Sequence, residues 1–79
     1  MLIRSRSGER ITNVNGVLLD QYTPTGKYAL LASDGLDPEG IIIGLYDTKA
    51  EAKAALDYIF RQAAHGKAAD LRHESEEPR

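Results

Sequence analysis

Hydrophobic positions in this chain of 79 residues follow one pattern up to residue 46 and a different one after it. The first part holds short runs rich in Val, Ile, Leu and Tyr, bounded by Gly, Pro, Asn and Asp, which is typical of β-strands. The sequence predicts strands at residues 2–4, 10–14, 17–23, 27–33 and 41–46. We therefore expect an antiparallel β-meander of four to five strands.

Two connections between these strands carry turn signals. Asn15-Gly16 suits a type I′ hairpin turn, because both residues tolerate the positive φ that this turn requires. Pro24-Thr25-Gly26 suits a turn in which proline fixes φ and glycine takes the left-handed position. Residues 34–40 hold three carboxylates without the ligand register of a calcium loop, so we interpret them as an acidic turn.

A helix of about residues 48–65 is predicted after the last strand. Thr48 and Glu51 have the spacing of a capping box, and His65-Gly66 is typical of a last turn and its stop. One face of this helix would hold Ala52, Ala55, Leu56, Ile59, Phe60 and Ala63, which recur at helical spacing. The chain is therefore predicted to be an α+β domain with one amphipathic C-terminal helix.

The end of the chain gives weaker signals. Residues 67–74 predict a short second helix with Ala68 and Leu71 as its apolar anchors. Residues 75–79 form a polar tail, so the expected organisation is a single domain over 1–74 followed by this tail. A chain this short forms one domain at most, and its core is thin.

The predicted strands are apolar on both faces, although one helix can cover only one face of a sheet. In the last strand Ile41, Ile43 and Leu45 alternate with Ile42 and Tyr46. Strands of this kind are normally buried on both faces, so we expect a homodimer or higher oligomer that covers the second face. Pairing of strand edges is a second way to assemble, and the alternative is a cover supplied by residues 67–74.

The amino-acid composition excludes several classes of site and location. There is no cysteine, which excludes disulfides and thiolate metal sites and fits a reducing compartment. The longest apolar run is too short to cross a bilayer, and no apolar segment follows Arg4 and Arg6 as in a secretory signal. We expect a cytoplasmic protein that does not contact membranes. The net charge is −2, with an excess of basic over acidic residues in 1–33 and an excess of acidic residues in 34–79.

The residues best suited to hold a ligand are three arginines and two tyrosines. Arginine forks match phosphate geometry, and tyrosine rings stack on bases. The candidate ligand-binding residues are therefore Arg4, Arg6, Arg10, Tyr22 and Tyr28. The alternative is that these arginines serve solubility and that the tyrosines are half-buried parts of the sheet.

Signals for catalysis, metals and cofactors are absent from the sequence. It contains no phosphate-binding glycine loop and no nucleophile elbow. His65 and His73 lie eight residues apart, which is not the spacing of a helical zinc site. We predict no catalytic residue, no metal site and no cofactor. Nucleic acid is an improbable partner because the overall charge is acidic.

The strand-to-helix junction and two N-terminal regions resemble those of known small proteins. The opening Leu2-Ile3-Arg4-Ser5, the region of Asn13 and Asn15, and the junction from Gly44 to Thr48 resemble small uncharacterised proteins of bacteria and their phages. Those proteins also end a strand in Gly-x-Tyr-x-Thr and continue into a helix that contains alanine and leucine. The resemblance implies no activity for any residue.

The leading functional hypothesis is a non-catalytic, homo-oligomeric binding protein. In its concrete form it is encoded by a phage and sequesters a small anionic nucleotide-type signal between subunits, which would counter a host defence. One alternative is an adaptor that docks on another protein, and a second is a small nucleic-acid-binding regulator, for which retention on DNA or RNA would fall steeply with salt.

Overall fold

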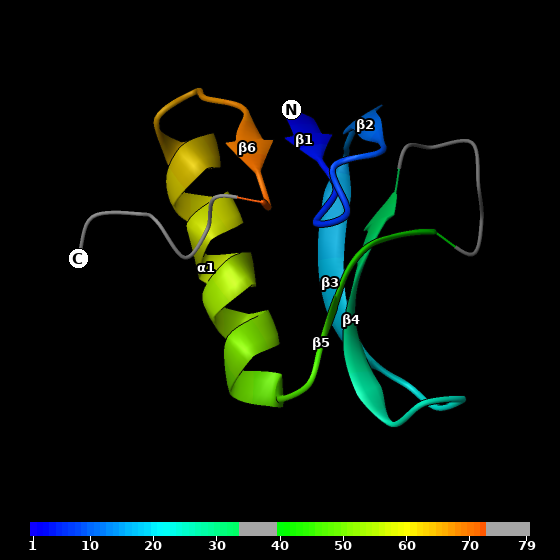
Figure 1. The fold of residues 1–79 in the computed structure, drawn as a ribbon. Helices are drawn as coiled ribbons and strands as arrows, with labels where there is room; N and C mark the ends of the chain where they lie inside the picture. Colours follow the sequence, from blue (N-terminus) through cyan, green and yellow to red (C-terminus); the bar gives the residue numbers. More distant parts are fainter. Residues whose placement is uncertain (34–39, 73–79) are drawn as a thin grey trace.

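In the computed structural model, residues 1–33 and 40–72 are described. Along the chain the elements are β1 (Leu2–Arg4), β2 (Ile11–Asn13), β3 (Gly16–Tyr22), β4 (Lys27–Ser33), β5 (Ile41–Tyr46), α1 (Lys49–Ala64) and β6 (Ala69–Asp70). Helix α1 lies along one side of the β3–β4–β5 sheet, and the three short strands lie at the top of the view in Figure 1. The predicted α+β class, with an antiparallel meander before a C-terminal helix, is confirmed.

Strands β3, β4 and β5 form an antiparallel sheet in that order. The turn between β3 and β4 confirms the prediction from Pro24-Thr25-Gly26. Gly26 has a φ of 73°, and its N–H donates to the Tyr22 carbonyl oxygen at 2.9 Å. This tight turn pairs Tyr22 with Lys27 and so sets the register of the hairpin.

The first two strands do not extend this meander but form a second sheet with β6, in the order β2-β1-β6. The turn that joins β1 to β2 is closed by the Ser5 N–H, which donates to the Arg10 carbonyl at 2.8 Å. The type I′ turn predicted at Asn15-Gly16 is wrong, because no non-glycine residue of the described chain has a positive φ and Gly16 already belongs to β3. The chain passes there from one sheet to the other.

The short helix predicted over 67–74 is also wrong within the described residues, because the chain forms β6 there. Gly66, with a φ of 67°, ends α1 in a Schellman arrangement in which the Lys67 N–H donates to the Gln62 carbonyl at 2.9 Å. The chain then runs parallel to β1, and the Leu71 N–H donates to the Arg4 carbonyl at 3.1 Å. Ala69 and Leu71 are buried with the two-residue period of a strand.

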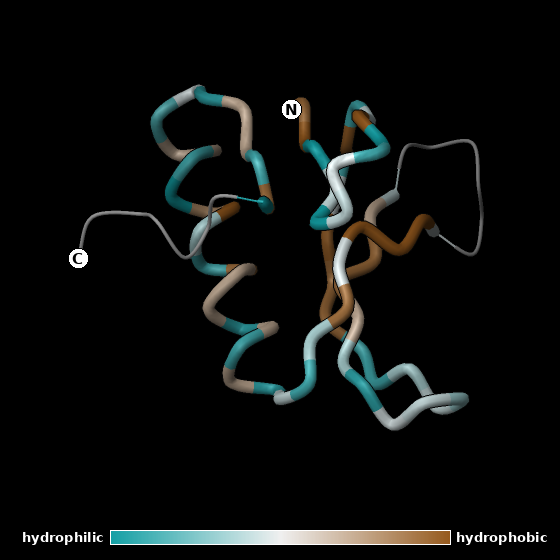
Figure 2. The backbone as a smooth tube through the Cα atoms, viewed as in Figure 1, coloured by the Kyte–Doolittle hydropathy of each residue, from teal (hydrophilic) through white to brown (hydrophobic). Residues whose placement is uncertain are grey.

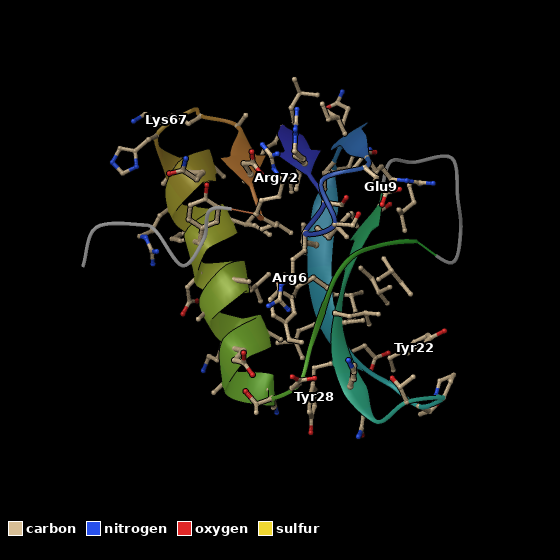
Figure 3. All side chains as sticks on the ribbon, in the orientation of Figure 1. Arg6, Glu9, Tyr22, Tyr28, Lys67 and Arg72 are labelled. Atoms are coloured by element: carbon tan, nitrogen blue, oxygen red, sulfur yellow. The ribbon has the colours of Figure 1, made fainter. Side chains whose placement is uncertain are left out.

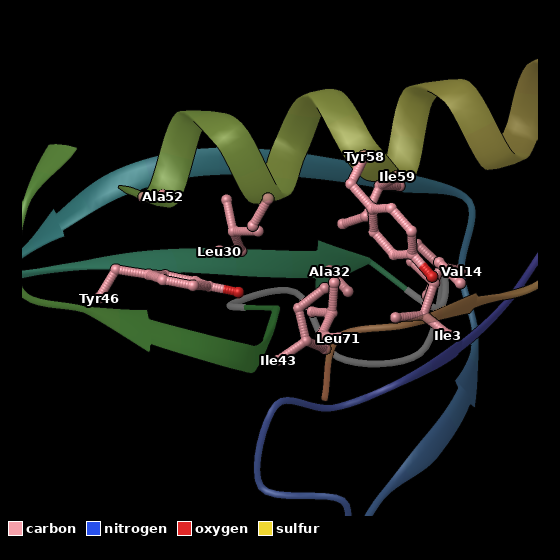
Figure 4. Packing of buried hydrophobic residues seen from close by; sticks show 12 residues of the cluster. Ile3, Val14, Leu30, Ala32, Ile43, Tyr46, Ala52, Tyr58, Ile59 and Leu71 are labelled. Carbon is pink, nitrogen blue, oxygen red and sulfur yellow. The ribbon is translucent and has the colours of Figure 1, made fainter. Parts of the chain in front are cut away.

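The core lies between α1 and the sheets (Figure 4). Its largest fully buried side chains are Ile3, Leu30, Ile43, Tyr46 and Leu71. On the helix, Ala52, Ala55 and Ile59 are buried as predicted, but Phe60 is 73% exposed and Tyr58 is buried in its place. The Tyr58 hydroxyl accepts a hydrogen bond from the Asp70 N–H at 3.3 Å, so the inward-facing aromatic residue is also bonded to β6.

Thr48 begins the helix as its N-cap. Its hydroxyl accepts from the Glu51 N–H at 3.1 Å, which confirms the cap. The Glu51 carboxylate accepts from the same hydroxyl at 3.0 Å, whereas a full capping box would have it accept from the Thr48 backbone N–H. Thr48→Ala should lower the free energy of unfolding by about 1 kcal/mol, because one N–H of the first turn loses its acceptor. Urea denaturation measures this loss, and Thr48→Ser is the control that keeps the oxygen. Equal losses in the two variants would contradict a capping role.

Candidate binding site

A β-bulge in β5 decides which residues face the helix. Leu30 pairs with Gly44 and Leu31 pairs with Ile42, so Ile43 is an extra residue in the ladder. The alternation predicted for this strand is therefore reversed after Ile43. Leu45 joins Ile42 on the face away from the helix, and Tyr46 turns into the core.

The face of the β3–β4–β5 sheet that points away from α1, called here the outer face, consists of rows set by the strand register. Leu18, Leu31 and Ile42 form one row across the three strands, and Asp20, Ala29 and Leu45 form the next. Tyr22 and Lys27 begin the last row, where Lys27 Nζ lies 3.3 Å from an Asp47 carboxylate oxygen. The outer face is therefore apolar at its centre and charged at one end.

The outer face leaves large apolar side chains accessible to solvent. Leu18 is 55% exposed, Ile42 is 41% exposed and Leu45 is 37% exposed. Figure 2 shows the concentration of hydrophobic residues along the sheet strands, in contrast to the mixed character of α1. No described element packs on this face, since the helix covers the opposite one. The two-sided hydrophobicity predicted from the sequence is thus present in the folded chain.

Gly44 and Tyr46 explain the Gly-x-Tyr-x-Thr junction in structural terms. A methyl group on Gly44 would lie 2.8 Å from the Tyr46 ring, so only glycine leaves room for that ring. Tyr46 is 1% exposed, and two residues later Thr48 caps the helix. The motif therefore turns the chain from sheet to helix around one buried aromatic ring.

Arg6 covers the edge of β5 that does not pair with β4. Its backbone N–H donates to the Ile43 carbonyl at 2.8 Å, and its Nη1 donates to the Leu45 carbonyl. The guanidinium carbon lies 4.3 Å from the centre of the Tyr46 ring, which is a cation–π contact. A single residue thus satisfies two edge carbonyls and stacks on the aromatic ring of the core.

A shallow groove of about 390 Å³ runs beside this contact. We call it the Arg6 groove; it is lined by Ser5, Arg6, Ser7, Ile42, Ile43, Gly44 and Leu45. The turn on one side of it is held by its own hydroxyls, because Ser5 Oγ accepts from the Arg10 N–H at 3.2 Å and lies 3.0 Å from Ser7 Oγ. The groove shares Ile42 and Leu45 with the outer face, so the two surfaces adjoin.

The five predicted ligand-binding residues do not meet at one place. Tyr22 lies on the outer face and projects away from the helix in Figure 3, whereas Tyr28 is half-buried against the core on the helix side. Strand β1 ends at Arg4, so the alternation that would place Arg4 and Arg6 on one face is interrupted. Arg10 is exposed just before β2. Arg6 is the one predicted residue that lines the groove.

Arg72 is a further basic residue at this end of the molecule. Its Nε and Nη2 donate to the two carboxylate oxygens of Asp70 at 3.0 and 2.7 Å, and this hydrogen bonding raises the pKa of Arg72 above its ordinary value. A methyl group on Gly8 would lie 2.7 Å from Arg72 Cδ, so the side chain rests on the turn between β1 and β2. Nothing in the local sequence indicates this contact.

Residues 34–39 and 73–79 lie outside the described chain, and with them the acidic turn, His73 and the predicted tail. Within the part that is described, no group of three or more His, Asp or Glu side chains gathers as metal ligands would. No described helix is long and apolar enough to cross a membrane. The predicted absence of catalysis stays a prediction.

The fold and surfaces define a small α+β protein in which α1 covers one face of the sheet and the described residues leave the other face uncovered. No family model, curated protein or solved structure matches the chain.

Proposed function

We propose that this protein is a non-catalytic binding protein that functions as a homo-oligomer, with the outer face as its subunit interface. The observation that carries the proposal is the apolar row Leu18–Leu31–Ile42, which continues across all three strands and has two strongly exposed members. Exposed apolar surfaces of this kind mark interaction sites.

The distribution of charge favours a second copy of this chain as the occupant. The centre of the outer face is apolar, and its charges, Asp20 and the Lys27–Asp47 ion pair, lie off that row toward one end. An interface with an apolar centre and a polar rim is typical of stable protein association. Two copies related by a two-fold axis present the same surface to each other, so apolar side chains meet apolar side chains.

Ile42→Glu tests this interface because it places a charge in the apolar row without entering the core. Light scattering should report a mass of at least two chains, about 17 kDa, for the wild type, against 8.7 kDa for one chain. The variant should have a lower mass, because a carboxylate buried between subunits would be unpaired.

Leu2→Glu is the matched control, since Leu2 is 53% exposed but belongs to the other sheet. This variant should keep the wild-type mass. A wild type that is a single chain at micromolar concentration would overturn the homo-oligomer and support the adaptor that docks on another protein.

A second candidate function is the sequestration of a small anionic nucleotide between subunits. The observation that favours it is the position of the Arg6 groove beside the outer face, because a subunit packed on Ile42 and Leu45 would border the groove. Arg6 would bind the phosphate, and Tyr22 from the outer face is the tyrosine available for stacking on a base. Calorimetry with cyclic and NAD-derived nucleotides tests this function, and absence of heat with all of them at high protein concentration would exclude it.

A further inference from the structure

The two edge strands of the β3–β4–β5 sheet differ in their hydrogen-bond partners. At the β5 edge, Arg6 donates hydrogen bonds to the carbonyls of Ile43 and Leu45. At the other edge, β3 has no strand partner among the described residues except β4. Open edges offer unpaired N–H and C=O groups to other chains, and proteins usually block them. This protein blocks one edge and, among the described residues, leaves the seven-residue strand β3 without a strand partner at the other, where the Gln21 N–H donates to the neighbouring Asp20 Oδ1 at 2.8 Å.

The size of the outer face supplies an independent reason to use this edge. Seven residues at about 3.3 Å each and three strands at about 4.8 Å each give a projected area of roughly 330 Å². A stable interface buries about 800 Å² on each partner. Accessible area exceeds projected area because side chains stand out from the sheet, but the outer face is still small for a stable interface, and a second contact between copies would strengthen it. Two sheets joined edge to edge would double the projected area to roughly 660 Å².

We infer that β3 pairs in an antiparallel way with β3 of a second copy, which joins two sheets into one of six strands. A two-fold axis at Leu19 pairs all seven residues and keeps each side chain on its own face. Leu18 then lies opposite Asp20 of the partner subunit, and the two Asp20 residues are diagonal neighbours about 7–8 Å apart. Gly16 lies opposite Tyr22 of the partner subunit, whose ring covers the backbone that glycine exposes.

The inference rests on the proposed function for its second interface and adds a defined assembly to it. Edge pairing makes a dimer whose joined outer face carries the two Asp20 side chains beside the two-fold axis, with an apolar region on either side of them. Two such dimers packed face to face through Leu31, Ile42 and Leu45 give a tetramer with dihedral symmetry. The expected mass is about 35 kDa, four times that of one chain of 8.7 kDa.

Amide hydrogen exchange of the wild-type protein tests the edge without any substitution. In an antiparallel edge strand, alternate N–H groups bond to the neighbouring strand and the others point outward. If β3 pairs with a second copy, both sets of β3 amides should exchange at least about tenfold more slowly than in an unstructured peptide. Outward-pointing amides that exchange at the unprotected rate would overturn the inference.

Proline variants test the edge by mass. Because successive N–H groups point to opposite sides of a strand, one of Asp20→Pro and Gln21→Pro removes an outward-pointing N–H and leaves the ladder to β4 intact. That variant should fold, as circular dichroism will show, and its mass should fall twofold. Gln21→Ala keeps the N–H and should keep the wild-type mass.

The two interfaces can fail separately in this design. A folded proline variant with the wild-type mass overturns the edge pairing and leaves the outer-face interface standing. Ile42→Glu with the wild-type mass overturns the outer-face interface and leaves the edge pairing standing. If both proline variants unfold, the amide exchange of the wild type decides alone.

Discussion

Tyr46→Ala should lower the free energy of unfolding by about 3–5 kcal/mol, the largest loss expected from a single substitution in this chain. Tyr46 is fully buried between the sheet and α1 (Figure 4), and its ring also carries the cation–π contact with the Arg6 guanidinium. Removal of the ring leaves a cavity beside Gly44, which has no side chain to fill it. Small domains have a total stability of about 5–15 kcal/mol, so the variant should be close to unfolding at 37 °C.

Tyr46→Phe separates the ring from its hydroxyl. This control keeps the volume of the ring and its face toward Arg6, so it should retain most of the stability that Tyr46→Ala loses. Thermal unfolding followed by circular dichroism measures both variants. Equal destabilisation by the two substitutions would show that the ring is not the source of the stability.

Leu71→Ala should cost about 2–5 kcal/mol, as expected for a fully buried leucine. Leu71 is 1% exposed, and its N–H donates to the Arg4 carbonyl, so the segment after α1 is part of the core. Loss of this anchor should also release β6 from β1 and remove the partner of the Tyr58 hydroxyl. The effect should therefore lie toward the upper end of the range.

Leu2→Ala provides the matched comparison for Leu71→Ala. It removes the same atoms from a leucine that is 53% exposed on the neighbouring strand β1, and it should cost less than about 1 kcal/mol. Urea denaturation at a fixed protein concentration measures both free energies, since stability coupled to assembly depends on concentration. A Leu71→Ala loss no larger than the Leu2→Ala loss would contradict the place of β6 in the core.

The assembly has a consequence for stability as well as for mass. If subunits cover the outer face, the midpoint of thermal unfolding should rise with protein concentration, because association stabilises only the folded chain. The same dependence should weaken in Ile42→Glu. Unlike Tyr46 and Leu71, Ile42 is exposed in the single chain, so its replacement changes assembly more than the fold of each subunit.

Local signals in the sequence correctly predicted the elements that depend only on neighbouring residues. The turn at Pro24-Thr25-Gly26 and the cap at Thr48 need only one or two specific side chains within the same few residues. The helix before Gly66 follows from apolar spacing and from the conformational freedom of that glycine. The two-sided apolar strands were likewise visible, since alternation depends only on residue order.

Predictions that depended on distant contacts failed. Asn15-Gly16 suits a hairpin turn locally, but β2 bonds to β1 and leaves the meander, which no local signal indicates. Phe60 was predicted on the apolar face, but the structure buries Tyr58, whose hydroxyl accepts from the Asp70 N–H of β6, and leaves Phe60 exposed. Of the candidate ligand residues, Arg6 lines a groove, whereas Tyr22 and Tyr28 lie on opposite faces of the sheet.

The sequence by itself determined where β1 to β5 form, where the helix begins and ends, and that more apolar sheet surface exists than one helix can cover. Only the tertiary structure decided which strands share a sheet, which residues the bulge at Ile43 turns outward, and which edge Arg6 closes. The reason is physical: turns, caps and periodicity are governed by residues close in the chain. Strand partners and the closing of an edge instead depend on hydrogen bonds between residues that are distant in the sequence.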